Sequence, residues 1–152
     1  MTKKLQVGTE SFDYPVQGDG NWGEEATAWA EAISNAVAES VGPNDIVATS
    51  AILTNNQVTP ADIPSLSFNT AEVLSAVISF MITRESTGTE VESGEFEINF
   101  DGTDWKSVQS GIGETGVILS ITSSGQVQYT STDLAGHISS SIRFRAKTLD
   151  QP

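Results

Sequence analysis

The run Glu95-Phe96-Glu97-Ile98-Asn99-Phe100 decides the fold of this chain. Polar and apolar residues alternate in it with a period of two. Successive side chains of a β-strand point to opposite faces, so this run buries its three apolar residues and leaves its three polar residues in solvent. The run therefore indicates a sheet with one buried face and one solvated face.

Similar runs lie on both sides of it. The expected strands are Ile46–Thr54, Ser65–Asn69, Ala76–Arg84, Glu95–Phe100, one that begins at Trp105, Val117–Ile121, Val127–Tyr129 and Ile142–Lys147. A Pro-containing loop precedes the second of these, and Ser123-Ser124-Gly125 forms a hairpin turn. Seven or eight short strands separated by turns predict a mainly-β fold, an antiparallel β-sandwich or jelly-roll-like domain.

A helical period replaces the period of two near the N-terminus. The residues Trp22, Ala26, Trp29, Ile33 and Val37 follow one another at spacings of four, three, four and four. These spacings place all five on one face of a helix. An Asn three residues before a Glu resembles a capping box at its start, and a Gly-Pro pair ends it. The sequence predicts one amphipathic helix of about 15–18 residues.

Residues 1–20 predict an extended arm with a few apolar anchors. We therefore expect two parts, an arm and helix over residues 1–43 for attachment or oligomerisation, and a β-sandwich domain over residues 44–152. The Trp-bearing face of the helix must be buried somewhere, either on its own chain or against a partner. The residues predicted to contact a partner are Phe12, Tyr14, Trp22, Trp29 and Ile33.

Composition restricts the partners and the chemistry. The chain of 152 residues has no cysteine, which excludes disulfides, thiolate metal sites and a cysteine nucleophile. Seven basic and 20 acidic residues give a formal charge of −13, which argues against nucleic acid and anionic membranes as partners. No segment is apolar and long enough for a signal peptide or a membrane span, so we expect a soluble protein that is not exported by a classical route.

Catalysis has two weak candidates. His137 is the single histidine, but it lies in a Gly-flanked loop without a nucleophile elbow, and a solvated loop histidine is the ordinary interpretation. Glu95 and Glu97 share one side of a strand, as two acids of a glycosidase would, and Glu90 and Glu92 form a similar pair. Cross-strand pairing of these acids with Arg143 and Arg145 is the ordinary alternative. We therefore expect no enzymatic activity and no catalytic residue.

Metal binding has one candidate. The acidic residues Asp101, Asp104, Glu114 and Asp133 lie in loops that could converge on a hard cation such as Ca²⁺. However, the segment from 101 to 104 does not match an EF-hand loop and is typical of a hairpin turn. Zinc spacing, a phosphate-binding glycine loop and a dinucleotide fingerprint are all missing from the sequence. We predict neither a metal nor a cofactor.

Two segments resemble structural proteins of tailed-bacteriophage virions. The first is Tyr14–Ser34, with the sequence YPVQGDGNWGEEATAWAEAIS, which resembles an element near the start of many phage structural proteins. The second runs from Ile82 to Ala146 and contains GVILSITSSGQVQYTST at 116–132 and IRFRA at 142–146. It is similar to the β-domain of head decoration and fibre proteins. Together the two segments cover somewhat more than half of the chain.

The resemblance implies a capsid decoration, cement or head-fibre protein of the virion, assembled in the host cytoplasm. Its implied partners are the major capsid protein or other virion subunits, and its implied state is a homotrimer. The N-terminal segment would contact the shell, and the β-domain would be displayed. The chain lacks shaft repeats, which favours a compact decoration protein. The alternative is a tail- or fibre-associated module that binds a receptor or glycan, with Trp105 as the aromatic contact.

Overall fold

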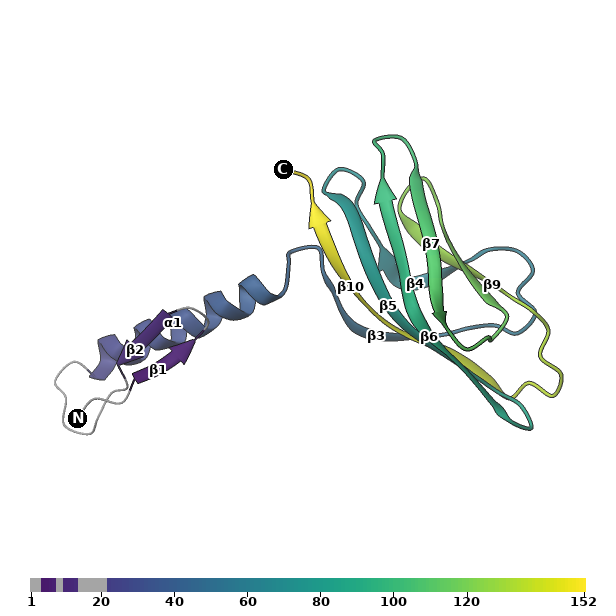
Figure 1. Ribbon diagram of the computed structural model, residues 1–152, viewed down its shortest axis with the longest axis horizontal. Helices are drawn as coiled ribbons and strands as arrows, with labels where there is room; N and C mark the ends of the chain where they lie inside the picture. Colours follow the sequence, from purple (N-terminus) through teal and green to yellow (C-terminus); the bar gives the residue numbers. More distant parts are fainter. Residues whose placement is uncertain (1–3, 8–9, 14–21) are drawn as a thin grey trace. The chain divides into compact units, whose positions relative to one another are not determined.

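The computed structural model describes residues 4–7, 10–13 and 22–152. The chain divides into two compact units, Met1–Gly42 and Pro43–Pro152. We call them the N-terminal unit and the β unit (Figure 1). The helix lies in the first unit and both large sheets lie in the second.

The N-terminal unit contains a hairpin and a helix. Strands β1 (Lys4–Val7) and β2 (Glu10–Asp13) pair in antiparallel register. Helix α1 (Trp22–Ser40) confirms the predicted helix. It contacts both strands of the hairpin. The predicted arm differs from the structure, because its described parts pair with each other. Pairing satisfies backbone groups that an isolated extended arm would leave to water.

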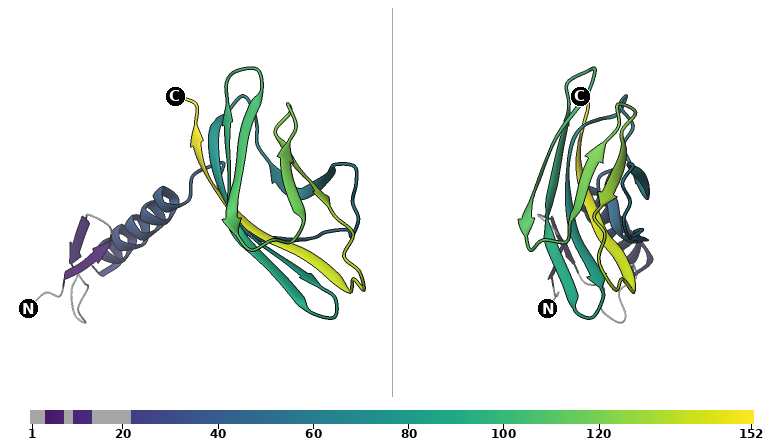
Figure 2. Two further views of the ribbon diagram at one scale, coloured as in Figure 1. Left: turned by 45° about the vertical axis from the view of Figure 1, so that its right-hand side comes forward. Right: turned by 90° about the vertical axis from the view of Figure 1, so that its right-hand side faces the viewer.

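The β unit is a sandwich of two antiparallel sheets. Its strands are β3 (Ile46–Ile52), β4 (Ala61–Ser67), β5 (Val73–Glu85), β6 (Thr89–Phe100), β7 (Trp105–Ile112), β8 (Val117–Ile121), β9 (Gln126–Ser131) and β10 (Ser139–Asp150). One sheet has the order β3-β10-β5-β6-β7 and the other the order β4-β9-β8. Figure 2 shows the two layers facing each other. The predicted antiparallel β-sandwich is confirmed.

The core lies between the two sheets and is built by alternation. Every second residue of β5 from Ala76 to Arg84 is buried, and β10 buries Ser140 to Ala146 in the same way. Strand β6 buries Phe96 and Ile98, as its sequence predicts. Among the residues whose side chains the structure describes, every buried residue of the hydrophobic core comes from the β unit. This unit therefore has a complete core of its own and is expected to fold without the N-terminal unit.

Two local features shape the three-stranded sheet. The predicted hairpin turn between β8 and β9 is present, with Gly125 at a φ of 88°. Its carbonyl oxygen accepts a hydrogen bond from the amide of Phe68 at 2.9 Å. Strand β4 starts earlier than expected and includes Pro64, which we had assigned to a loop. Proline is tolerated there because β4 is an edge strand.

Candidate binding surfaces

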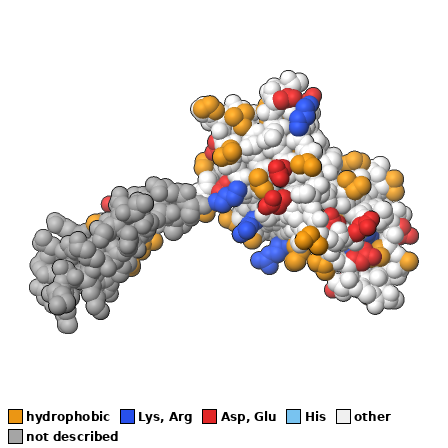
Figure 3. Space-filling model, viewed as in Figure 1, with side chains coloured by type: hydrophobic (Ala, Val, Ile, Leu, Met, Phe, Trp, Pro, Cys, Tyr) orange, Lys and Arg blue, Asp and Glu red, His pale blue; other side chains and the backbone are white. Residues whose placement is uncertain are grey.

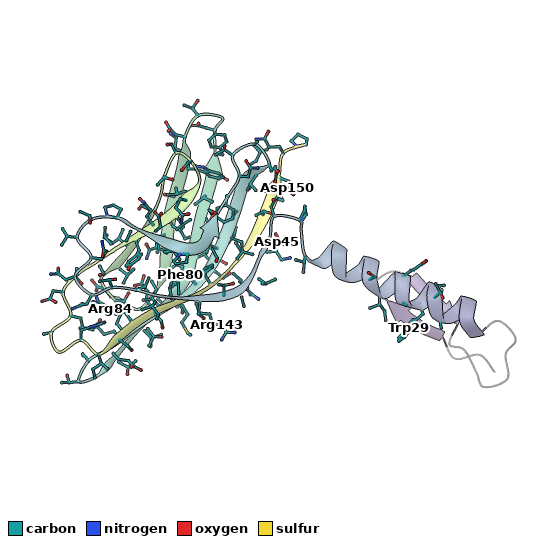
Figure 4. The ribbon with its side chains drawn as sticks, turned by 180° about the vertical axis from the view of Figure 1, so that it is seen from behind. Trp29, Asp45, Phe80, Arg84, Arg143 and Asp150 are labelled. Atoms are coloured by element: carbon teal, nitrogen blue, oxygen red, sulfur yellow. The ribbon has the colours of Figure 1, made fainter. Side chains whose placement is uncertain are left out.

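The first candidate surface is the apolar face of α1. Trp29 is 37% exposed, and Ile33, one turn further along the same face, is half-buried. Figure 4 shows Trp29 projecting from the helix. Phe12 lies in β2 and Trp22 is the first residue of α1, but the structure does not describe their side chains. Tyr14 lies outside the described residues, so the role assigned to these five residues stays a prediction.

The aromatic residues of the β unit lie in its interior. Trp105 is only 8% exposed, and its ring packs 5.1 Å from that of Phe100 and 6.2 Å from that of Phe68 (centroid distances). The suggestion that Trp105 is an exposed glycan contact is therefore wrong. The remaining aromatic residues of this unit, Phe80, Phe96, Tyr129 and Phe144, are buried as well. An aromatic platform for stacking on a sugar is thus missing from the β unit.

The second candidate surface is the outer face of the five-stranded sheet. Glu95 and Glu97 are exposed there on β6, and Arg143 and Arg145 are exposed on β10. The predicted cross-strand pairing between these acids and arginines is wrong, because β5 lies between the two strands. Figure 3 shows the Lys and Arg side chains in a row beside Asp and Glu side chains on the visible face of this unit.

A buried arginine lies at one end of the sandwich interior. Arg84 is 1% exposed, and Figure 4 shows it between the sheets. Its guanidinium group donates to five oxygen atoms, one for each of its N–H groups. The acceptors are Ser140 Oγ at 3.3 Å, the Thr115 carbonyl at 2.6 Å, Thr132 Oγ1 at 3.5 Å, the Thr132 carbonyl at 2.9 Å and Asn55 Oδ1 at 2.5 Å. Since all five donors are used, Arg84 is a structural residue that joins the five-stranded sheet to three loops, those between β3 and β4, between β7 and β8, and between β9 and β10.

A buried carboxylate accompanies this arginine. Glu92 is 9% exposed and accepts hydrogen bonds from Thr115 Oγ1 at 2.7 Å and from the Thr115 amide at 3.1 Å. Gln109 donates a third at 3.0 Å. Thr115 therefore links Glu92 to Arg84. Glu90 and Glu92 face the interior side of β6, away from Glu95 and Glu97, so the four acids do not form one surface site.

A pocket of about 340 Å³ opens beside Arg84. Glu90, Glu114 and Asp133 line it together with Thr115 and other loop residues. Because the donors of Arg84 are already used, an anionic ligand would find no free guanidinium N–H at its floor. The pocket is lined by acids and offers an anion little attraction.

His137 contributes to the same network. Its Nε2 lies 2.8 Å from Oγ of Ser140, the hydroxyl that also accepts from Arg84 Nε. Ser140 is 4% exposed, so its hydroxyl is out of reach of a substrate. The pair resembles a Ser-His dyad only in distance. Its role is to hold in place the Ser140 hydroxyl that accepts a hydrogen bond from the buried arginine.

The loop acids do not converge. Asp101 and Asp104 lie in the turn after β6, whereas Glu114 and Asp133 line the pocket near the start of the same strand. Over the part of the chain that the structure describes, no group of three or more acidic or histidine side chains is placed to hold a metal ion. The alternative of a Ca²⁺ site built from these four acids is therefore wrong.

Asp101 shapes the β6–β7 turn. Its Oδ1 accepts hydrogen bonds from the amides of Asp104 at 2.8 Å and Thr103 at 3.0 Å, and its Oδ2 lies 3.3 Å from Lys106 Nζ. These two amides, in that order of importance, and then Lys106 hold the pKa of Asp101 below its ordinary value. A lowered pKa means that the ionised form stabilises the folded turn.

This turn yields a pH-dependent prediction. The stabilisation by Asp101 is complete above its unfolded-state pKa and is lost as the pH falls through the lower folded-state pKa. Asp101→Ala should therefore lower the melting temperature at pH 7, and the difference from the parent should shrink on acidification. Thermal unfolding followed by circular dichroism between pH 7 and pH 2 measures it. The control Asp104→Ala removes a neighbouring carboxylate but keeps the Asp101 hydrogen bonds, so an equal pH dependence in both variants would contradict the assignment.

Comparisons with known proteins complete this description. No protein-family model matches the chain, and no curated protein matches it. Among solved structures, the chain is similar to the tailspike protein of Acinetobacter phage vB_ApiP_P1, with a TM-score of 0.45 and 18% sequence identity. The similarity covers 68% of this chain and 21% of the tailspike chain. In the described part of the chain, no helix has the length and apolar composition needed to span a bilayer.

Proposed function

We propose that this chain is a non-enzymatic structural protein of a phage virion, most specifically a capsid decoration or cement protein. The N-terminal unit binds the major capsid protein or another virion subunit, and the β unit is displayed. The resemblance of residues 14–34 and 82–146 to virion proteins supports the assignment to a phage particle. A homotrimer is part of the same proposal, with the N-terminal unit as the part through which the three copies associate.

The exposure of the aromatic side chains supports the assignment of partner binding to the N-terminal unit and of display to the β unit. Trp29 on α1 is 37% exposed, whereas Trp105 is 8% exposed and the other aromatic side chains of the β unit are buried or half-buried. Tryptophan is enriched among the residues that contribute most to protein–protein binding, and it contributes most when a partner desolvates it. Trp29 and Ile33 together form the apolar anchor that such a partner would cover.

The alternative is a tail- or fibre-associated module that binds a receptor or glycan. The buried position of Trp105 removes the aromatic contact that this alternative would use. The outer surface of the β unit still offers polar loops for a receptor. The position of the protein on the particle separates the two functions.

Binding to particles tests the proposal. Particles that lack this protein are incubated with the full chain or with the double variant Trp29→Ala/Ile33→Ala, and bound protein is measured after sedimentation. Loss of two apolar anchors of roughly 1–2 kcal/mol each should weaken binding at least tenfold. The matched control Glu31→Ala alters an exposed residue of the same helix and should bind as the parent does.

Electron microscopy of the same particles locates the protein. Hundreds of copies over the shell support decoration. A few copies at the tail support the receptor-binding alternative. Failure of the full chain to bind any particle, or equal binding by the double variant, would overturn the role given to the N-terminal unit.

A further inference from the structure

The outer face of the five-stranded sheet separates its charges by strand. Arg143, Arg145 and Lys147 lie on this face of β10, while Glu95 and Glu97 lie on the same face of β6. Three of the seven basic residues of the chain are thus on one strand. Strand β5 runs between the two charged strands and presents only uncharged residues from Ser75 to Thr83.

The register of the sheet aligns these charges in rows. Arg145 is paired with Ser79, which is paired on its other side with Glu95. Lys147 is paired with Val77, which is paired on its other side with Glu97. Each row therefore reads cation, uncharged residue, anion. The two charged positions of a row are two strand spacings apart, about 10 Å.

The two arginines and two glutamates of this face have no ion-pair partner among the described residues, whereas Lys147 already has one. Lys147 binds Asp45 at 2.7 Å, and Lys106 binds Asp101 at 3.3 Å. Among the described residues, neither Arg143 nor Arg145 forms an ion pair with a carboxylate, and Glu95 and Glu97 form none with a cation. The charge of Arg145 is thus available to a partner that carries a carboxylate at the same position along the strand.

The face is also apolar for an exposed surface. Seven large apolar side chains on it are at least 40% exposed, and these are Ile52, Val77, Met81, Val91, Val108, Ile112 and Leu149. A shallow pocket of about 360 Å³, lined by Ala48, Ser79, Met81 and the two arginines among others, hollows the face next to β10. Exposed apolar area rimmed by charge is typical of a protein–protein contact.

We propose that this face binds the same face of a second copy of the chain about a two-fold axis that runs along β5. Rotation about this axis leaves each residue at the same position along the strand direction. It brings β10 of one copy to face β6 of the other copy. It places Arg145 of one copy opposite Glu95 of the other, twice per dimer. Val77, Ser79 and Met81 then meet their own counterparts.

The charge pattern selects this axis over the alternative. A two-fold axis across the strands would place β10 on β10 and β6 on β6, so that like charges would oppose each other. Sheets that pack face to face lie about 10 Å apart, a gap that an arginine and a glutamate can bridge together. Five strands of about eight residues give a face of about 600 Å² per copy, near the lower limit for a specific interface. The dimer should accordingly have a dissociation constant in the micromolar range.

The test measures self-association of residues 43–152, which hold a complete core, and then of the full chain, by sedimentation equilibrium. The fragment should dimerise at tens of micromolar. Arg145→Glu and Glu95→Arg should each weaken the dimer at least tenfold, because each places like charges opposite each other. The double variant Arg145→Glu/Glu95→Arg restores opposite charges and should return to within about threefold of the parent. Asp104→Arg, a reversal at an exposed residue of the β6–β7 turn, is the matched control and should have no effect.

Several outcomes would overturn the two-fold contact. The proposal is overturned if residues 43–152 are monomeric at 500 µM, whatever the oligomeric state of the full chain. If Arg145→Glu and Glu95→Arg both leave the dissociation constant unchanged, the copies associate through another surface. Failure of the double variant to recover rules out the Arg145–Glu95 pairing. These measurements need no virion, and they leave the Trp29→Ala/Ile33→Ala test of the N-terminal unit untouched, so the two proposals fail separately.

Discussion

Arg84→Ala is expected to destabilise the β unit by about 3–5 kcal/mol, the range for breaking a buried charged network. The substitution leaves five acceptor oxygens without their donor in the interior, where unsatisfied polar groups are costly. It also removes the hydrogen bond that holds Thr115, the residue that donates to Glu92. The free energy of unfolding from urea titration, followed by circular dichroism, measures the loss.

Two controls sharpen this experiment. Arg84→Lys keeps the charge but cannot supply five donors in a fixed fork, so its loss should be intermediate. Arg143→Ala removes an exposed arginine from the neighbouring strand and should change the stability by about 0.5 kcal/mol or less. A loss below about 1 kcal/mol for Arg84→Ala would contradict the structural role of this arginine.

Phe96→Ala should cost a similar amount, about 3–5 kcal/mol, through a different cause. The ring is 1% exposed in the middle of β6, so its removal takes apolar surface out of the core and leaves a cavity. Packed interiors close such cavities only in part. Urea unfolding of the parent and the variant again gives the difference in free energy.

Phe100→Ala is the matched comparison for Phe96. It has the same chemistry four residues later on the same strand, but its ring is only half-buried, beside Trp105. The loss should therefore be clearly smaller, and the fluorescence of Trp105 should report the altered packing. Equal losses at the two positions would show that burial does not control the cost on this strand.

The alternation of single strands could be predicted from the sequence, because it is a local property. The run at 95–100 places Phe96 and Ile98 in the core, as found. The same reasoning could have found Arg84, since it continues the even-numbered buried face of Ile78, Phe80 and Ile82. A charged residue in phase with a buried apolar face is the signal that was missed.

The order of the strands could not be predicted in the same way. Which strand lies between β6 and β10 depends on contacts far apart in the sequence, and no short pattern encodes it. The expected pairing of Glu95 with Arg145 failed for this reason, although both residues are on the expected face. The loop at Pro64 was assigned from local propensity, which an edge strand overrides.

Strand β4 has a consequence for contacts between copies of the chain. Exposed sheet edges can recruit strands from other copies and start aggregation. Pro64 removes one backbone donor from this edge, and the register of β4 against β9 is interrupted between Asp62 and Ser67. Ser65 adds a left-handed turn of the backbone, with a φ of 63°. The β4 edge of the smaller sheet is thereby a poor template for the addition of a strand from another copy.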